Sequence, residues 1–253
     1  MFSNIASDEL VPSDDLIASQ RIGQGNFIEI GENLVDWYVS KGFISNSSII
    51  LDIGCGLGRI ARPLIPLLKD MGTYYGFDNN KCSIKWCREK YAGHINFNFQ
   101  WIDVHSKFYN PESSTDKSTI FFPLPNDYVD FINLTSVFTH MKINHVRTYL
   151  LEISRMLKPG KYCYITYFLV DQLVSKHFKE SVSLGKWHPI DSGYMQDPDC
   201  PEKVILLDED VILQLYSEAG LTIKKVTYGS WCKKARGKFD GGYQDAIIAF
   251  KNN

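Results

Sequence analysis

Several common features are missing from this chain, and each absence narrows the class of protein. No run of apolar residues is long enough to cross a membrane as a helix. The first residues, Met-Phe-Ser-Asn-Ile-Ala-Ser, lack a basic segment followed by an apolar core, so we expect no signal peptide. No internal repeat or low-complexity tract is visible. We therefore expect a cytoplasmic protein with no membrane partner.

Paired cysteines and an excess of basic charge are missing as well. The net charge of −2 and the pI near 6.3 argue against nucleic acid as the main partner, because phosphate recognition needs a basic face. We expect a small-molecule partner and a monomer or homodimer. Six cysteines show no paired metal-ligand spacing, and we expect them to be reduced thiols: Cys55, Cys82, Cys87, Cys163, Cys200 and Cys232.

Apolar strands alternate with amphipathic stretches along most of the 253 residues. This length suits one well-packed α/β core, and the alternation predicts a largely parallel sheet. The second to fifth strands are expected at 72–77, 96–102, 128–134 and 162–168, and two more at 221–228 and 246–251. We therefore expect a single domain over residues 1–253.

The most informative stretch is residues 49–59, Ile-Ile-Leu-Asp-Ile-Gly-Cys-Gly-Leu-Gly-Arg. Its apolar run ends in Asp52, and glycines follow at alternate positions. Glycines there let the backbone pass close to a ligand at the N-terminus of a helix. A dinucleotide fingerprint needs GxGxxG, but Arg59 occupies the place of its third glycine. The spacing indicates a nucleotide-binding turn that is not of the dinucleotide form.

This turn resembles the S-adenosylmethionine-binding turn of the class I methyltransferases, and the resemblance continues in register along the chain. Asp78 ends the next strand, about twenty residues on, where the family's acidic residue accepts ribose hydroxyls. Asp103 and Val104 end the third strand, where the family places a carboxylate near the adenine amine and a backbone amide near its ring. Leu-Lys-Pro-Gly at 157–160 is another frequent family feature. The matches cover roughly residues 30–170 and the final two strands.

The resemblance implies a Rossmann-like class I methyltransferase fold, which is α/β with a mostly parallel seven-stranded sheet, a C-terminal antiparallel hairpin and helices on both faces. It implies S-adenosyl-L-methionine as the cofactor. The residues expected to bind it follow the first four strands: Asp52, Gly54, Cys55, Gly56, Gly58, Arg59, Asp78, Asn79, Asp103, Val104, Thr135 and Ser136. Simpler alternatives stay open, because Asp78 and Asp103 also suit turn or helix caps and Thr135 and Ser136 also suit a turn.

Methyl transfer from a sulfonium needs alignment of an electron-rich acceptor and removal of a proton. His140, shortly after the fourth strand, is the best-placed base, since imidazole titrates near neutrality. Its alternative role is to cap the following helix. His105 and His188 are weaker choices. We expect no metal, because no carboxylate cluster follows the fourth strand, and the acidic residues at 208–210 suit a helix start.

Three segments depart from a minimal methyltransferase and are expected to select the acceptor. The extension over residues 1–30 contains a loop at 23–27 that leads to a helix beginning near Glu29, and by family analogy the extension folds over the cofactor. The segment 105–126 reads as a loop near the active site. The third segment, 170–205, reads as an inserted substrate cap, with surface decoration as its alternative. The residues expected to bind the acceptor are Phe138, Trp187, His188, Trp231, Arg236 and Tyr243.

We expect methyl transfer to a hydroxyl of a small molecule, because the turn after the fourth strand lacks an Asn-Pro-Pro-Tyr-type motif of amino-directed enzymes. Ser-Val-Phe-Thr-His-Met at 136–141, with the Leu-Lys-Pro-Gly and the later Tyr-Gln-Asp, resembles bacterial enzymes of saccharide or secondary-metabolite pathways. Carboxyl methylation of a peptide or small acid is one alternative. A nicotinamide-dependent oxidoreductase and a silent cofactor-binding subunit are the others, and the C-terminal hairpin argues against the oxidoreductase.

A cluster of basic residues near the C-terminus leaves two interpretations. It is either a solvated hairpin loop or a site for an anionic acceptor, such as a phosphorylated or nucleotide-linked sugar. Its members are Lys224, Lys225, Lys233, Lys234, Arg236 and Lys238.

Overall fold

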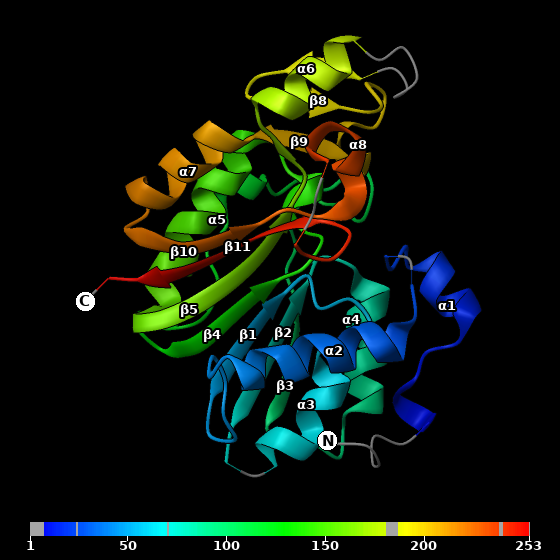
Figure 1. Cartoon of the computed structure of the whole chain (residues 1–253). Helices are drawn as coiled ribbons and strands as arrows, with labels where there is room; N and C mark the ends of the chain where they lie inside the picture. The colour runs from blue at the N-terminus through cyan, green and yellow to red at the C-terminus, as the bar shows by residue number, and fades with distance from the viewer. Residues whose placement is uncertain (1–7, 24, 70, 181–186, 238–239, 253) are drawn as a thin grey trace.

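A computed structural model describes residues 8–23, 25–69, 71–180, 187–237 and 240–252 (Figure 1). Residues 1–7 of the predicted extension, 181–186 of the predicted insertion and Lys238 of the basic cluster lie outside the described residues. No helix in the described part of the chain has both the length and the apolar character that crossing a membrane requires.

The described residues form a central sheet of seven strands in the order β10-β11-β5-β4-β1-β2-β3. The neighbours from β5 to β3 are parallel, whereas β11 is antiparallel to both β5 and β10. The predicted fold with its C-terminal antiparallel hairpin is confirmed. The strands are β1 (Ile49–Ile53), β2 (Thr73–Asp78), β3 (Phe97–Trp101), β4 (Val129–Leu134), β5 (Leu157–Tyr167), β10 (Leu221–Thr227) and β11 (Asp245–Lys251).

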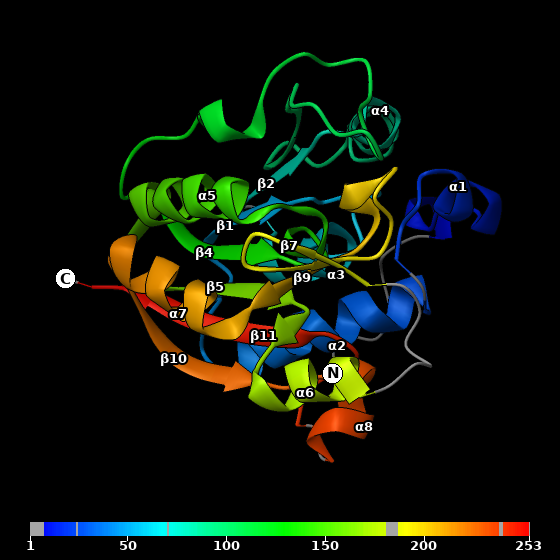
Figure 2. The same cartoon turned by 90° about the horizontal axis from the view of Figure 1, so that it is seen from above.

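Helices cover both faces of the sheet (Figure 2). One face carries α2 (Phe27–Ser40), α3 (Ala61–Leu68) and α4 (Lys81–Lys90), and the other carries α5 (Ile143–Met156) and α7 (Glu209–Glu218). Because side chains alternate along a strand, the buried Ile50 packs toward the first group and the buried Leu51 toward the second. The β1 strand is therefore apolar on both sides, as its sequence predicts.

Two element boundaries differ from the sequence-based expectation. Helix α2 begins at Phe27 rather than near Glu29, because the Asn26 side chain accepts hydrogen bonds from Ile28 N and Glu29 N, both at 3.0 Å. Strand β5 begins at Leu157 rather than Tyr162, directly after α5, so that the Lys-Pro-Gly sequence lies inside the strand.

The predicted insertion forms a second sheet in the order β6-β9-β8-β7. We call residues 169–208 the cap; in Figure 1 it lies above the carboxyl ends of the parallel strands. Its small core holds Val170, Val174 and Leu206 and is completed by Cys232, next to α8 (Lys233–Arg236). The cap elements are β6 (Leu169–Val170), α6 (Gln172–Glu180), β7 (His188–Ile190), β8 (Gly193–Met195) and β9 (Ile205–Asp208).

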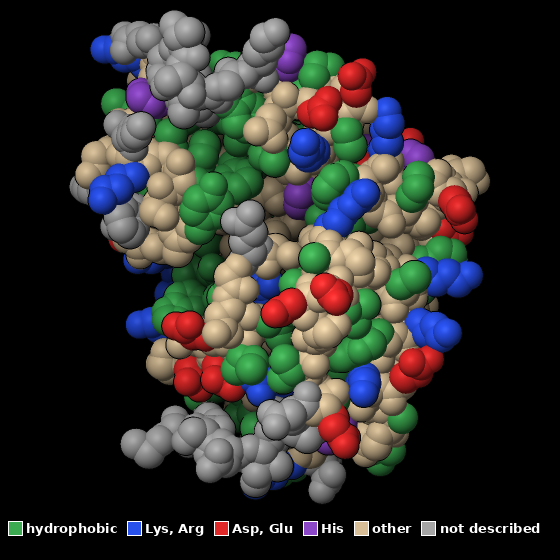
Figure 3. Space-filling view, turned by 90° about the vertical axis from the view of Figure 1, so that its right-hand side faces the viewer, with side chains coloured by type: hydrophobic (Ala, Val, Ile, Leu, Met, Phe, Trp, Pro, Cys, Tyr) green, Lys and Arg blue, Asp and Glu red, His purple; other side chains and the backbone are tan. Residues whose placement is uncertain are grey.

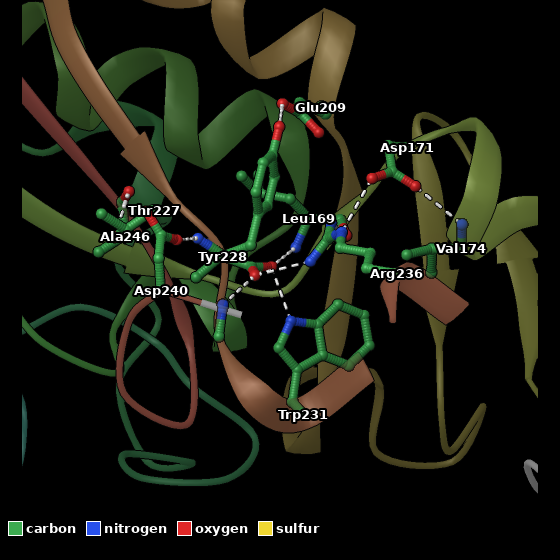
Figure 4. Close-up of polar contacts among 12 residues, drawn as sticks. Leu169, Asp171, Val174, Glu209, Thr227, Tyr228, Trp231, Arg236, Asp240 and Ala246 are labelled. Atoms are coloured by element: carbon green, nitrogen blue, oxygen red, sulfur yellow. Dashed lines mark hydrogen bonds and ion pairs between the residues drawn. The ribbon is translucent and has the colours of Figure 1, made fainter. Parts of the chain in front are cut away.

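A buried ion-pair network holds the cap to the end of the central sheet (Figure 4). Arg236 lies between two carboxylates, with Nε 2.8 Å from Asp171 Oδ2 and Nη1 2.8 Å from Asp245 Oδ1. Asp245, which is fully buried, also accepts hydrogen bonds at 2.7 Å from Leu169 N and Trp231 Nε1. The first residue of β11 thereby fixes the point at which the chain leaves β5 and enters the cap.

Candidate cofactor and acceptor site

A cavity lies at the carboxyl ends of the parallel strands, where ligands bind in open α/β sheets. Its walls come from the turn after β1, the end of β2, the turn after β4, the 102–122 segment and the N-terminal residues 20–23. In Figure 3 this side of the molecule is hollowed near its middle, and hydrophobic side chains gather beside the hollow. The cavity is therefore bounded by segments that are far apart in sequence.

The glycine turn after β1 is held against β2 and closely covered by the N-terminal segment. Gly54 N and Cys55 N both donate to Phe77 O, at 2.7 and 3.1 Å. Gly56 has φ +52°, and a Cβ built there would lie 2.7 Å from Cδ1 of Ile22. A side chain at position 56 would therefore push the Ile22 side chain aside and strain the turn.

Asp78 joins the glycine turn to the start of α4. Its Oδ2 accepts from Gly56 N and its Oδ1 from Asn80 N, both at 2.7 Å, and burial raises its pKa. Asn80 caps α4 by accepting from Ser83 N at 3.0 Å. The Ser83 hydroxyl faces the same cavity, fully buried, and has no hydrogen-bond partner among the described residues. A buried hydroxyl of this kind is suited to a polar ligand.

Asp52 forms the centre of a buried polar network under the cavity. It accepts hydrogen bonds from Tyr74 Oη at 2.7 Å and Asn133 Nδ2 at 2.6 Å. Tyr38 Oη and Thr135 Oγ1 donate in turn to Asn133 Oδ1, at 2.7 and 3.0 Å. Loss of solvation raises the pKa of Asp52 to about 6 although both donors oppose the rise. A carboxyl with this pKa responds to a cation placed in the cavity.

The N-terminal residues 20–23 form one wall of the cavity through two arginine contacts. Arg59, which follows the glycine turn, donates from Nη2 to Gly23 O at 2.6 Å, and its guanidinium lies 5.5 Å from the ring centre of Phe27. The Arg21 guanidinium lies 4.1 Å from the ring centre of Phe108, in the loop after β3. The N-terminal segment therefore bridges the glycine turn and the loop.

His140 lies on the cavity wall in a short 3-10 turn, Phe138–His140. Its Nδ1 is 2.8 Å from the Glu202 carbonyl oxygen of the cap, and its Nε2 is 3.4 Å from Tyr109 Oη. A carbonyl only accepts, so Nδ1 carries the proton and Nε2 is the basic nitrogen. Burial lowers the pKa of His140, and burial raises that of Tyr109 to about 12. At neutral pH the imidazole is therefore uncharged, and the Tyr109 hydroxyl keeps its proton.

Comparison with known proteins agrees with this geometry. The family described as "Methyltransferase domain" matches residues 44–227, which is most of the chain. The chain belongs to the methyltransferase domain family. This match confirms the predicted family and, with it, the S-adenosylmethionine cofactor.

Individual relatives of this methyltransferase domain are distant. A curated protein, "Putative methyltransferase 235L" of Invertebrate iridescent virus 6, is 30% identical over 122 residues, which are 48% of this chain and 38% of the viral protein. The chain spans well under half the length of the curated relatives it matches.

Two solved structures show the same fold. A SAM-dependent methyltransferase from Methanosarcina mazei has 18% identity and a TM-score of 0.56, over 85% of this chain and 97% of that one. Magnesium protoporphyrin IX methyltransferase from Synechocystis PCC 6803, solved with bound SAH, has 14% identity and a TM-score of 0.56, over 94% of both chains.

Most of the residues predicted to bind the cofactor line the cavity of this methyltransferase domain. Ser136 among them has φ 61°, which is rare outside glycine, and its backbone N donates to Thr166 Oγ1 at 2.7 Å. Val104 N is already bonded to Ile102 O at 2.9 Å. The predicted residues that face the cavity are Asp52, Gly54, Cys55, Gly56, Arg59, Asp78, Asn79, Val104, Thr135 and Ser136.

Two residues predicted to bind the cofactor lie outside the cavity wall. A Cβ at Gly58 would meet Tyr91 Oη at 2.9 Å, so this glycine permits close packing against Tyr91, the C-cap residue of α4. The Asp103 carboxylate is exposed and accepts from Asn110 Nδ2 at 3.2 Å. This contact fits the alternative role of Asp103, as a carboxylate that supports a turn, and its role in cofactor binding stays a prediction.

The residues predicted to bind the acceptor also lie outside this cavity wall, and their role in acceptor binding stays a prediction. Phe138 is fully buried in the main core, and the Arg236 guanidinium is occupied by its two carboxylates. Trp187 and Trp231 pack on the small core of the cap, and Tyr243 is 67% exposed. The half-buried His188 lies in β7 at the edge of the cap sheet.

The sequence did not indicate several residues that surround His140. Tyr109 and Lys117 lie in the loop after β3, which the sequence marks as a loop near the active site without singling out these positions. Glu202 comes from the cap. His140 itself does not cap α5, because Lys142 holds that position and makes no side-chain cap. The alternative role of His140 as a helix cap is therefore excluded.

Proposed function

We propose that this protein transfers the methyl group of S-adenosylmethionine to a hydroxyl of a small-molecule acceptor. The observation that carries the proposal is a partly buried, uncharged imidazole on the wall of the cofactor cavity, with its basic Nε2 facing a phenol hydroxyl. A saccharide or secondary metabolite is the proposed acceptor class, on the resemblance of the 136–141 motif and the Leu-Lys-Pro-Gly sequence to bacterial enzymes of such pathways.

The cavity residues suit the cofactor. Gly56 lines the cavity with a backbone that has φ +52°, Asp78 supplies carboxylate oxygens, and Ser83 supplies a hydroxyl that has no partner among the described residues. Bound S-adenosylmethionine supplies an activated methyl, whose bond to sulfur breaks as the acceptor oxygen bonds to its carbon.

His140 accounts for the proton released from the acceptor. A neutral imidazole accepts a hydroxyl proton at Nε2 while the Glu202 carbonyl keeps Nδ1 protonated and the ring oriented. The Tyr109 hydroxyl occupies the position next to Nε2 in this structure, so an acceptor hydroxyl takes its place or bonds beside it.

The proposal is tested by mixing the protein with S-adenosylmethionine and a panel of sugars, phenols and small acids. Mass spectrometry then detects acceptors that gain one methylene unit. We expect alcohols or phenols to gain it and matched acids to give no ester. Ester formation on acids alone would replace the proposal by carboxyl methylation, and binding of S-adenosylhomocysteine without any product would indicate a silent cofactor-binding subunit.

His140→Ala tests the base directly. We expect kcat at pH 7 to fall by at least about a hundredfold with little change in cofactor affinity, and higher pH to restore part of the rate. In the unchanged protein the rate should fall only below the usual titration range of histidine, because burial lowers the pKa of His140. His105→Gln is the control, since its Nδ1 is 2.7 Å from Ser113 O and His105 lies outside the cavity wall. A fall of less than about tenfold for His140→Ala would favour an acceptor that is already ionised.

A further inference from the structure

Glu202 links the cap to the loop after β3 through its side chain, and to His140 through its backbone. The carboxylate forms an ion pair with Lys117 Nζ and accepts a hydrogen bond from Ser106 Oγ, while the carbonyl faces His140 Nδ1. Only 4% of the Lys117 side chain and 14% of the Glu202 side chain are exposed. This pair is therefore buried beside the imidazole.

Burial of such a pair needs a reason, because desolvation offsets most of its Coulomb energy. Ser106 and Lys117 line the cavity, but the Glu202 carboxylate already neutralises the lysine. The pair therefore adds little net charge to attract an acceptor. The pair instead fixes the position of the 3-10 turn Pro201–Lys203, in which the Glu202 carbonyl orients the imidazole.

We propose that Lys117 and Glu202 are positioning residues that hold His140 in its reactive orientation and balance its charge. This inference rests on the proposed role of His140 as the base. The two residues act in opposite senses. The ammonium of Lys117 opposes an imidazolium at His140, and the carboxylate of Glu202 favours one.

The other titratable groups near the imidazole are Tyr109, His105, His145 and Asp116. Tyr109 faces Nε2 and stays protonated. His105 helps to lower the pKa of the Glu202 carboxyl, and Nε2 of His145 in α5 lies 3.4 Å from Asp116 Oδ1. Substitution of Lys117 or Glu202 therefore changes the charges nearest to His140 and leaves these groups in place.

The experiment is a titration of the histidine rings by NMR, with the His140 signal identified by its loss in His140→Gln. Lys117→Met should raise the pKa of His140 and Glu202→Gln should lower it, with the double variant between the two. Glu112→Gln and Lys203→Met change exposed charges in the same two segments and should leave the pKa of His140 unchanged. Lys117→Arg should titrate like the unchanged protein.

The inference would be overturned if Lys117→Met and Glu202→Gln both left the pKa of His140 unchanged within the error of the titration. It would also be overturned if both variants shifted this pKa in the same direction. Lys117→Gln replaces Lys117→Met if that variant does not fold. The titration needs no acceptor, so the inference is tested independently of the proposed activity. If an acceptor is found, the acid limb of kcat/KM should move with the measured pKa in each variant.

Discussion

Asp78 lies where the glycine turn, α4 and the cavity meet. Its carboxylate supports two backbone N–H groups and faces the cofactor cavity as well. We expect Asp78→Ala to weaken binding of S-adenosylhomocysteine by roughly 2 to 3 kcal/mol, through loss of charge-assisted hydrogen bonds. Calorimetric titration measures this loss. Asp103→Ala is the matched control and should change the affinity less than about twofold, because Asp103 is an exposed turn carboxylate. Equal losses in both variants would contradict the placement of Asp103 outside the site.

Asp52 predicts a pH dependence of cofactor binding. Its pKa is raised to about 6, and a cation in the cavity favours the ionised carboxylate. The affinity for S-adenosylmethionine, which carries a sulfonium, should therefore fall as the pH falls through about 6. The affinity for the product S-adenosylhomocysteine, whose sulfur is uncharged, should fall less. Calorimetry across this pH range tests the difference, and Asp52→Asn should abolish it. Persistence of the full difference in Asp52→Asn would assign the dependence to another group.

At the scale of elements, the cap is held by charges that are almost fully buried, and Figure 4 shows how they converge on Arg236. Arg236→Gln leaves Asp245 without its cation, so we expect the free energy of unfolding to fall by about 3 to 5 kcal/mol. Urea denaturation measures it. Lys225→Gln breaks the exposed pair with Asp240, at 3.3 Å, and should cost less than about 1 kcal/mol. Similar costs for the two variants would mean that the Arg236 network does not anchor the cap.

The sequence predicted elements better than it predicted contacts between them. The glycine turn, the acidic strand ends and the C-terminal hairpin depend on local periodicity and turn chemistry, which the sequence shows directly. The apolar run before Asp52 is an example. The start of β5 was missed because pairing with β4 extends the strand through Pro159.

The site around His140 could not be predicted in the same way. Glu202 reaches Ser106 and Lys117 across the molecule, and no periodicity in the sequence indicates which residue of the cap meets which residue of the loop. Aromatic and basic residues of the cap region suggested acceptor binding by their type. Arg236 instead balances buried carboxylates, since a guanidinium with several donors satisfies them together.

For the whole molecule, the fold and its cofactor predict that an adenosine-containing thioether stabilises the protein and that a nicotinamide dinucleotide does not. S-adenosylhomocysteine at about one hundred times its Kd should stabilise the native protein by about 2.7 kcal/mol. This corresponds to a rise in Tm of about 5 to 10 °C. Thermal unfolding followed by circular dichroism measures it. Nicotinamide dinucleotides should leave Tm unchanged, because Arg59 occupies the place of the third glycine of their fingerprint. A rise with the dinucleotide alone would support an oxidoreductase.

The place of β11 has a consequence for how the protein is made. It is the last strand in sequence, yet it lies between β5 and β10 in the sheet, and its first residue, Asp245, bonds to Leu169 N, 76 positions earlier. A chain emerging from the ribosome can pair β1 to β5 early, but β10 has no neighbour until β11 arrives. The cap likewise lacks the Asp245 part of its anchor until then. We therefore expect the strands that carry the glycine turn to pair before β10 joins the sheet and before the cap is fully anchored.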